Sequence, residues 1–312
     1  MLLVTFHGGK PGKHPLKNNV HAYDKRGKLI SPKVLEESEG LVLDELRGIH
    51  CNGRYLYVVV ANKEQNSLHC YEGENTKYRL VGRFASHLTT KGILHPFDFT
   101  FDGNGYCYVS SQDTNVVTRL RLNDGGKSCR PAPIAPALPA HGSFHPGTFV
   151  ASSVGSLSQP ATTVVPEPAG LAYSADGARK HSVRGVLWNK QALYVADQPA
   201  SRIKVFDSKG KFLGQSNPVE TPTHLLVQGD RLYVTGANEI LCADLPDPPG
   251  HLELKPIPGL RVRNGGAMAF SSSGNLYIAS RTENRIFKFD PNFRQLSFEC
   301  DLPDNPEFLL HI

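Results

Sequence analysis

The sequence has no long hydrophobic run, no closely spaced pair of cysteines and no block of like charges. Its longest N-terminal apolar run, residues 2–6, is too short for the core of a signal peptide or for a membrane span. The six cysteines form no C-x-x-C pair, which argues against a structural zinc site and against a dense disulfide framework. Lys and Arg are scattered and the formal net charge is only +5, so nucleic-acid binding is not expected. We expect a soluble, cytoplasmic protein that does not associate with membranes.

The motifs of several common catalytic classes are also missing. There is no G-x-S-x-G nucleophile elbow, no phosphate-binding G-x-x-x-x-G-K-[ST] and no G-x-G-x-x-G at a strand–helix junction. The chain contains 29 Gly, 23 Pro and only 2 Met, a composition that suits many short strands joined by turns. Function must therefore be inferred from the fold and from the placement of single side chains.

One unit of about four strands recurs along the chain. It consists of an apolar strand, a Gly/Asn turn, an aromatic-aliphatic strand, a polar loop, and then Asn or Ser before an alternating strand. Clear copies read VRGVLWNKQALYVADQPASRIKVFDSKGK from Val183 and AMAFSSSGNLYIASRTENRIFKFD from Ala267, and weaker copies begin at Leu46, Pro96 and Pro222. The third strand of each unit is predicted to start at Asn19, Asn66, Asn115, Ser201, Asn238 and Asn284.

The two ends of the chain supply one divided copy. LLVTFH and NNVHAYDKRGKLI match the second and third strands, and the C-terminal NPEFLLHI matches the missing first strand. Pairing of both ends in one sheet closes a ring and removes exposed sheet edges. We therefore predict one all-β domain over residues 1–312, a six-bladed β-propeller closed by its N- and C-terminal strands in one blade.

One interval between units is much longer than the others. Residues 125–180 form a Pro/Ser-rich stretch with two plausible strands, at Thr148–Val154 and Gly170–Tyr173. A long insertion is our preferred interpretation, because the stretch lacks a recognisable pair of second and third strands; a degenerate seventh blade is the alternative. We expect the insertion to act as a lid over the site, with contributions from His141, Phe144 and His145.

The copies at Val183–Lys211 and Ala267–Asp290 resemble the NHL-repeat family of β-propellers, whose consensus contains Leu-Tyr-Val-Ala-Asp followed by Asn-Arg-Ile and Phe-Asp. The resemblance covers most of the chain outside residues 125–180 and implies the fold more than any activity. NHL propellers often bind proteins or peptides within larger proteins, so a protein partner is one option. Because Arg47, Arg184 and Asp197 occupy consensus positions, the resemblance also implies that they could brace neighbouring blades.

Propeller geometry selects candidate site residues without a motif. The innermost strand of a blade starts, and the second strand ends, on the same face of the ring, so these ends line the mouth of the central channel. We predict catalytic roles for His7, His95, Glu45 and Glu307. We predict substrate-binding roles for Arg47, Arg184, Arg281, Asn62, Gln112 and Phe97. The arginines can fork onto a carboxylate or phosphate, which predicts a small anionic substrate, and His or Glu can transfer protons.

Histidines at the mouth could also hold a divalent metal. We predict His7, His95 and His181 as ligands for Zn or Mg, with Ca as the choice if Glu45, Glu307, Asn62 and Asn264 supply oxygen ligands; otherwise no cofactor is expected.

The favoured function is a small-molecule enzyme of lyase or hydrolase type at the channel mouth, with or without metal assistance. The alternative is an NHL-type protein- or peptide-binding module without catalysis, and a third option is a scaffold without a ligand. No sequence feature predicts self-association, and we expect a monomer.

Overall fold

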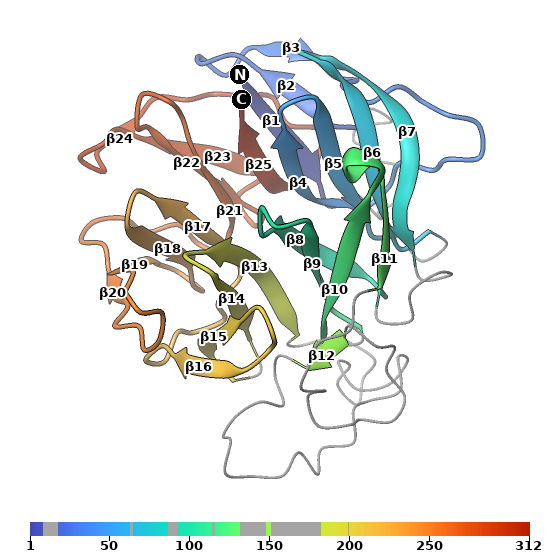
Figure 1. Ribbon diagram of the computed structural model, residues 1–312. Coiled ribbons are helices and arrows are strands. Elements are labelled where there is room, and N and C mark those ends of the chain that lie inside the picture. The colour runs from blue at the N-terminus through green and yellow to red at the C-terminus, as the bar shows by residue number, and fades with distance from the viewer. Residues whose placement is uncertain are drawn as a thin grey trace, which may run out of the picture.

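The computed structural model describes residues 1–8, 18–62, 65–86, 93–113, 116–131, 148–150, 182–198 and 200–312. Six antiparallel sheets are arranged around a central axis, which confirms the predicted six-bladed β-propeller (Figure 1). No helix in this part of the chain is long and apolar enough to cross a membrane. All six cysteines are free thiols.

The blades are numbered from the one that holds both chain ends, and their strands are given from the axis outward. Blade 1 contains β25 (Pro306–His311), β1 (Leu2–Phe6), β2 (His21–Tyr23) and β3 (Leu29–Ser31). Blade 2 contains β4 (Leu46–Asn52), β5 (Tyr55–Val60), β6 (Ser67–Glu74) and β7 (Lys77–Ser86). Blade 3 contains β8 (Pro96–Phe101), β9 (Tyr106–Ser111), β10 (Val116–Asn123), β11 (Ser128–Pro131) and β12 (Thr148–Val150), with a 3-10 turn η2 (Asp124–Gly126).

Blade 4 contains β13 (Val183–Asn189), β14 (Ala192–Asp197), β15 (Arg202–Asp207) and β16 (Phe212–Gln215). Blade 5 contains β17 (Leu225–Gln228), β18 (Arg231–Thr235), β19 (Ile240–Asp244) and β20 (Lys255–Pro256). Blade 6 contains β21 (Gly265–Phe270), β22 (Leu276–Ser280), β23 (Arg285–Phe289) and β24 (Gln295–Leu296). The third strands thus begin one or two residues after the Asn or Ser positions predicted from the repeat.

The ring closes as the sequence predicts. β1 pairs with β25 on one side and with β2 on the other, so the first and last strands share blade 1. The Met1 ammonium group donates to the Ile312 carbonyl (2.6 Å), and the Ile312 N–H donates to the Met1 carbonyl (2.9 Å). The chain ends accordingly lie side by side in Figure 1.

Two short strands from the long interval between repeats join the propeller at the outer edge of blade 3. β11 pairs with Leu120–Asn123 and β12 pairs with Val116–Thr118, so the two strands act in succession as the outer strand beside β10. Residues 128–131, expected within the insertion, therefore belong to a blade, and the strand expected at Thr148–Val154 is present as Thr148–Val150. The predicted strand at Gly170–Tyr173 and the lid residues His141, Phe144 and His145 lie outside the described residues.

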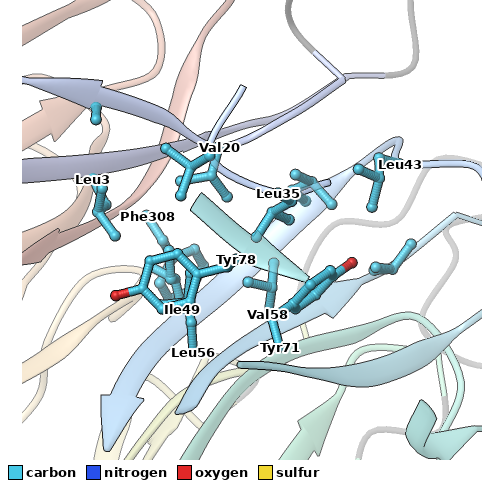
Figure 2. Close-up of a cluster of buried hydrophobic side chains, with 14 of the residues drawn as sticks. Leu3, Val20, Leu35, Leu43, Ile49, Leu56, Val58, Tyr71, Tyr78 and Phe308 are labelled. Carbon is cyan, nitrogen blue, oxygen red and sulfur yellow. The ribbon is translucent and has the colours of Figure 1, made fainter. Parts of the chain in front are cut away.

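The core lies between the blades. Second strands are buried on both faces because a neighbouring blade packs against each side, as in Leu56–Val60 of β5. Figure 2 shows one such cluster, in which Leu3 and Val20 of blade 1 lie near Val58 and Tyr71 of blade 2. Burial of these side chains holds adjacent blades together. It contributes a stabilising free energy of about 25 cal/mol for each Å² of apolar surface removed from water.

Several inner strands start with an irregularity. Glu45 and His95, which directly precede β4 and β8, have positive φ values of 50° and 51°, and the strand pairing then shifts register between its first and fourth residues. The shift is a bulge, which re-aims side chains and leaves a backbone N–H without a strand partner. A hydroxyl of the second strand accepts that N–H, as Ser110 does from Asp98 (3.1 Å) and Thr5 does from Phe308 (3.0 Å).

Candidate functional site

The starts of the inner strands place one residue from every blade around the mouth of the channel. These six residues, called the mouth ring, are Arg47, Phe97, Arg184, Thr223, Gly266 and Glu307. Four of the site residues predicted from the sequence therefore share one ring, because they occupy equivalent positions at the start of inner strands. The ring carries three charged side chains, Arg47, Arg184 and Glu307, and the geometry of these charges determines what the mouth can bind.

Aromatic side chains close the channel below the mouth. The ring centroids of Phe97 and Phe308 are 5.1 Å apart, and those of His224 and Phe308 are 5.5 Å apart. The three residues come from blades 3, 1 and 5, which are not neighbours, so their contacts cross the axis. Burial lowers the pKa of His224 to about 3, and its neutral ring accepts the Met268 N–H at Nδ1 (3.2 Å). The mouth is therefore a blind funnel with an uncharged floor.

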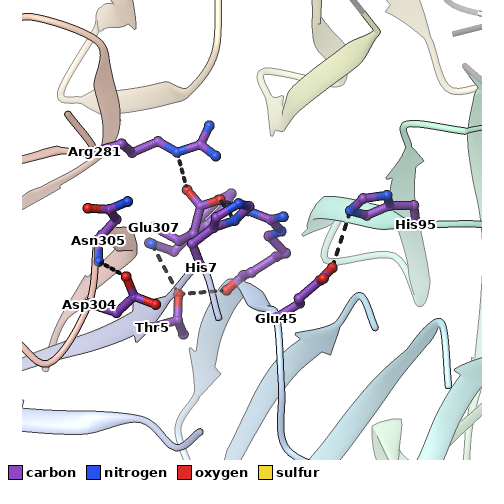
Figure 3. Close-up of polar contacts among 10 residues, drawn as sticks. Thr5, His7, Glu45, His95, Arg281, Asp304, Asn305 and Glu307 are labelled. Atoms are coloured by element: carbon purple, nitrogen blue, oxygen red, sulfur yellow. Dashed lines mark hydrogen bonds and ion pairs between the residues drawn. The ribbon is translucent and has the colours of Figure 1, made fainter. Parts of the chain in front are cut away.

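Glu307 is the centre of the charged network. Its Oε2 lies 2.8 Å from Nε of Arg281, and its Oε1 pairs with Arg47 and lies 3.2 Å from Nδ1 of His7 (Figure 3). The side chains of Glu307 and Arg47 are only 1% and 3% exposed. Since Arg47 and Arg281 belong to blades 2 and 6, the carboxylate braces the closing blade against both neighbours. Catalysis by Glu307 and substrate binding by Arg47 stay predictions, and the contacts give both a bracing role.

The surroundings of His7 disfavour the protonated form of its ring. Burial and, after it, the charges of Arg47 and Arg281 lower the pKa of His7 to about 2. Arg184 adds a further positive charge to this effect, and the charge of Glu307 is already shared between two guanidinium groups. The ring is therefore neutral across the physiological range of pH.

A cleft of about 480 Å³ opens beside this network, over blades 4, 5, 6 and 1. His7, Arg281, Asn264, Asn305 and Thr221 are among the residues that line it. Within the described part of the chain, the terminal amino groups of Arg281 and the side-chain amides of Asn264 and Asn305 make no hydrogen bond. The cleft thus offers several unused donors around one cationic group.

Arg184 forms the opposite wall of the cleft. Its Nε donates to Oε1 of Gln198 (3.0 Å), and the Gln198 amide donates to Oγ1 of Thr223 (3.2 Å). The Arg184 guanidinium also lies over the ring of Phe97, 5.0 Å from its centroid. Stacking and hydrogen bonding hold the guanidinium above the floor, where its charge faces the cleft.

A second group of titratable side chains lies at the mouth between blades 2 and 3. The His95 cluster comprises His95, Glu45 and Asp113: His95 Nε2 is 3.7 Å from a Glu45 oxygen and Nδ1 is 3.4 Å from an Asp113 oxygen. The His95 backbone is fixed because its N–H donates to Asn66 Oδ1 (2.7 Å) and its carbonyl accepts from the Gln112 N–H (3.0 Å). Asp113 follows the end of a second strand, which is one of the positions that the sequence analysis places at the mouth, although no specific role was predicted for it.

Asp98 is a buried carboxyl group in the wall between blades 3 and 4. Its two oxygens accept the N–H groups of Phe99 (2.9 Å) and Val186 (3.2 Å), and so they join one inner strand to the next. Burial nevertheless raises the pKa of Asp98 to about 7. The contacts indicate a structural link between blades.

The remaining predicted site residues lie elsewhere. The Asn62 amide donates to the Val42 carbonyl (3.0 Å) and accepts the Gln65 N–H (2.9 Å), so it holds a loop. Gln112 is 3% exposed and Phe97 belongs to the floor. Asp197 forms a fully buried ion pair with Lys204 (2.8 Å) of the next strand, so this contact stabilises blade 4 itself and does not join it to a neighbouring blade.

The metal prediction finds little support in the donor set. His181 lies outside the described residues, and in the rest of the chain no three His, Cys, Asp or Glu side chains gather in a way that could hold a metal ion. His7 uses Nδ1 toward Glu307, and both ring nitrogens of His95 face carboxylates. Metal binding stays a prediction, and no chemical step is assigned to a metal.

Comparison with known proteins supports the fold. No family model and no curated protein matches the chain. Among solved structures, it is similar to a candidate 6-phosphogluconolactonase from Bacteroides uniformis, with 14% identity, a TM-score of 0.57, and coverage of 95% of this chain and 80% of that one. It is also similar to virginiamycin B lyase from Staphylococcus aureus (12% identity, TM-score 0.50, 84% and 73% coverage) and to a chain of a nidogen/laminin complex (12%, 0.57, 99% and 97%). At these identities the likeness shows a β-propeller; it does not confirm the NHL type.

Proposed function

We propose that the protein is a small-molecule enzyme of hydrolase or lyase type, with its site at the channel mouth and a substrate that carries an anionic group. The observation that carries the proposal is the asymmetry of the mouth. A cationic cleft with unused donors lies on one side of His7, and the His95 cluster lies on the other (Figure 3). The charge of His95 also contributes to the lowered pKa of His7, so both halves act within one electrostatic environment.

The cleft is suited to an anionic group. Arg281 is held at Nε by Glu307, which leaves its two terminal amino groups to fork onto a carboxylate or phosphate. Asn264 and Asn305 can add neutral donors, and Arg184 adds charge from the opposite wall. Pre-organised donors of this kind lose little entropy when a ligand binds, because salt bridges and stacking already hold the guanidinium groups.

The His95 cluster is suited to proton transfer. The imidazole of His95 lies between two carboxylates, those of Glu45 and Asp113, which hold it in orientation, and an imidazole can both accept and donate a proton. In hydrolysis such a group would take a proton from water and return it to the leaving group; in elimination it would move a proton of the substrate. General acid–base catalysis of this kind typically contributes about 10²- to 10⁴-fold in rate.

The test uses turnover of anionic esters, lactones and eliminable carboxylates by the wild-type protein and three variants. We expect His95→Gln to lower kcat by about 10²-fold or more, and Arg281→Met to raise KM. His251→Gln is the matched control, because His251 is exposed and forms its ion pair with Glu253 at the surface. Unchanged turnover in His95→Gln, with an unchanged melting temperature, would rule out the proposed chemistry. Specific capture of a peptide without turnover of any of these compounds would favour the binding module.

A further inference from the structure

We propose that Gln198 is a positioning residue of the cleft: it fixes the guanidinium of Arg184 at Nε, so that Arg184 meets the anionic group of a substrate with its terminal amino groups. This inference rests on the proposed function, because it concerns how the same cleft recognises its anion. It depends on a relay of hydrogen bonds that crosses from blade 4 to blade 5, on the frame that supports the relay, and on the neutrality of the Gln198 amide.

The relay runs in one direction only. The Thr223 hydroxyl lies 3.1 Å from the Thr221 carbonyl and, since a carbonyl only accepts, the hydroxyl gives its one hydrogen there. Thr223 Oγ1 can then only accept from Gln198, 3.2 Å away, so Gln198 presents its amino group to Thr223. The amide oxygen is left for Arg184, whose Nε donates to it at 3.0 Å. Both ends of the relay therefore require the same orientation of the amide.

The backbone around the relay holds its members at a fixed spacing. Thr223 donates its N–H to the Thr235 carbonyl (2.9 Å) and accepts the Gly185 N–H at its own carbonyl (2.8 Å), so it is tied to blade 5 and to blade 4. The two segments approach so closely that a Cβ atom on Gly185 would lie 2.8 Å from the Thr223 carbonyl oxygen. Because Arg184 directly precedes Gly185, its backbone is fixed relative to Thr223. Gln198 is only 8% exposed, so little water competes for these hydrogen bonds.

Contacts on two sides determine which edge of Arg184 a ligand can meet. One face of the guanidinium lies over the ring of Phe97, 5.0 Å from its centroid, and Nε is engaged by Gln198. A guanidinium forks onto an anion either side-on, through Nε and one amino group, or end-on, through both amino groups. With Nε engaged, Arg184 can fork onto a ligand only end-on. Arg281, which also lines the cleft, is held in the same way, because its Nε lies 2.8 Å from Glu307.

The two arginines differ in the group that holds them. Glu307 is a carboxylate, and its charge offsets that of Arg281. Gln198 is a neutral amide, so its contact orients Arg184 and leaves the positive charge unchanged. Without this contact, the side chain would have to be ordered when a ligand binds, a loss that corresponds to about two- to ten-fold in affinity.

Sulfate binding, measured by isothermal titration calorimetry, tests the inference. We expect Arg184→Met to weaken binding by about ten-fold or more, because a charged donor is lost. Gln198→Met removes the acceptor but keeps the arginine, and should weaken binding by about two- to ten-fold. Gln228→Met is the matched control and should bind sulfate as the wild type does, because Gln228 is exposed at the end of β17 that points away from the mouth.

A double variant separates positioning from a purely structural role. If Gln198 acts through Arg184, adding Gln198→Met to Arg184→Met should not weaken sulfate binding further. A general effect on the blades would instead make the two losses add. Thr223→Val frees the Gln198 amide to rotate and should weaken binding, whereas Thr223→Ser keeps the hydroxyl and should restore it.

Gln198→Glu separates orientation from charge. The carboxylate still accepts from Nε of Arg184, but its negative charge repels the ligand, so sulfate should bind about ten-fold or more weakly. In ¹⁵N-labelled protein, the Nε–H of Arg184 should exchange with water more slowly than that of the exposed Arg26, both in the wild type and in Gln198→Glu. Equally fast exchange in the wild type would overturn the inference even if no variant folded.

The outcomes distinguish the inference from the proposed function. Absence of sulfate binding by the wild type would overturn the anion site itself, and the inference with it. Unchanged affinity in Arg184→Met would overturn the inference and leave an anion site at Arg281. Binding that Arg184→Met weakens and Gln198→Met leaves unchanged, or additive losses in the double variant, would overturn the inference alone.

Discussion

Substitution of Glu307 by Gln tests the charged network at the closing blade. The amide keeps the shape of the side chain but removes the charge that Arg47, Arg281 and His7 share. Arg281 is 30% exposed and can regain water, but Arg47 is 3% exposed and would lose its carboxylate partner at the closing blade while it stays buried. Loss of one partner of a buried ion pair costs about 3–5 kcal/mol.

That free energy can be expressed as a change in melting temperature. For a chain of 312 residues, the entropy of unfolding is about 0.65 kcal/mol/K near 60 °C, so the variant should melt about 5–8 °C below the wild type. Differential scanning calorimetry measures the change directly. Glu37→Gln is the matched control, because Glu37 forms an ion pair with Lys33 (2.7 Å) in which both side chains are well exposed. Its effect should stay within about 1 kcal/mol.

A double variant completes the test. Combining Glu307→Gln with Arg47→Met removes both buried charges, so most of the lost stability should return. A shift of less than about 2 °C in Glu307→Gln would refute the reasoning, because it would mean that Arg47 is not held as a buried cation by this carboxylate. The reasoning would be equally refuted if the double variant melted as low as the single one.

Three further predictions concern the blades and the cofactor. Thr235→Val removes the hydroxyl that accepts the His224 N–H (2.9 Å). This change should lower the free energy of unfolding, measured in urea, by about 1–3 kcal/mol. The control, Thr282→Val at the surface, should have little effect. The pKa of Asp98 is raised to about 7, so the folded state binds a proton more tightly than the unfolded state does. The contribution of this group to the free energy of unfolding should therefore fall as pH rises from about 4 to about 7, by at most about 4 kcal/mol. Asp98→Asn should reduce the difference in urea stability between pH 4.5 and pH 7.5, and an unchanged difference would contradict the assignment. If a metal braces the mouth, purified protein should contain it in near-stoichiometric amount and chelation should lower the melting temperature; absence of both effects would remove the metal prediction.

Much of the fold was readable because polar residues mark the strand starts. Asn66, Ser201 and Asn284 directly precede third strands, and all three have positive φ values, of 36°, 51° and 47°. Asn tolerates this left-handed conformation better than most residues, so selection of Asn there leaves a visible pattern. Glu45 and His95 adopt the same conformation before inner strands. Glu is not typical of it, and His, although enriched there, is a single case among many histidines, so the sequence carried no repeated signal.

The sequence predicted which side chains lie at the candidate site, but not which of them form ion pairs with each other. Strand ends identify which side chains reach the mouth, and Arg184 and Arg281 indeed line the cleft. Arg47 and Glu307 were assigned separate roles in binding and catalysis, although they neutralise each other across the closing blade. Such pairing depends on distances set by ring closure between residues far apart in sequence. The divided outer strand of blade 3 was missed because Ser128–Pro131 has no alternating pattern.

The aromatic floor affects how a ligand enters and leaves the site. Because Phe97, Phe308 and His224 close the axis beneath the mouth, a ligand cannot cross the ring, and it leaves by the opening through which it entered. In the enzyme proposed above, substrate and product would thus compete for one passage. Each turnover would include a step in which the funnel refills with water, and release of product would set an upper bound on the rate even if the proton transfers were fast.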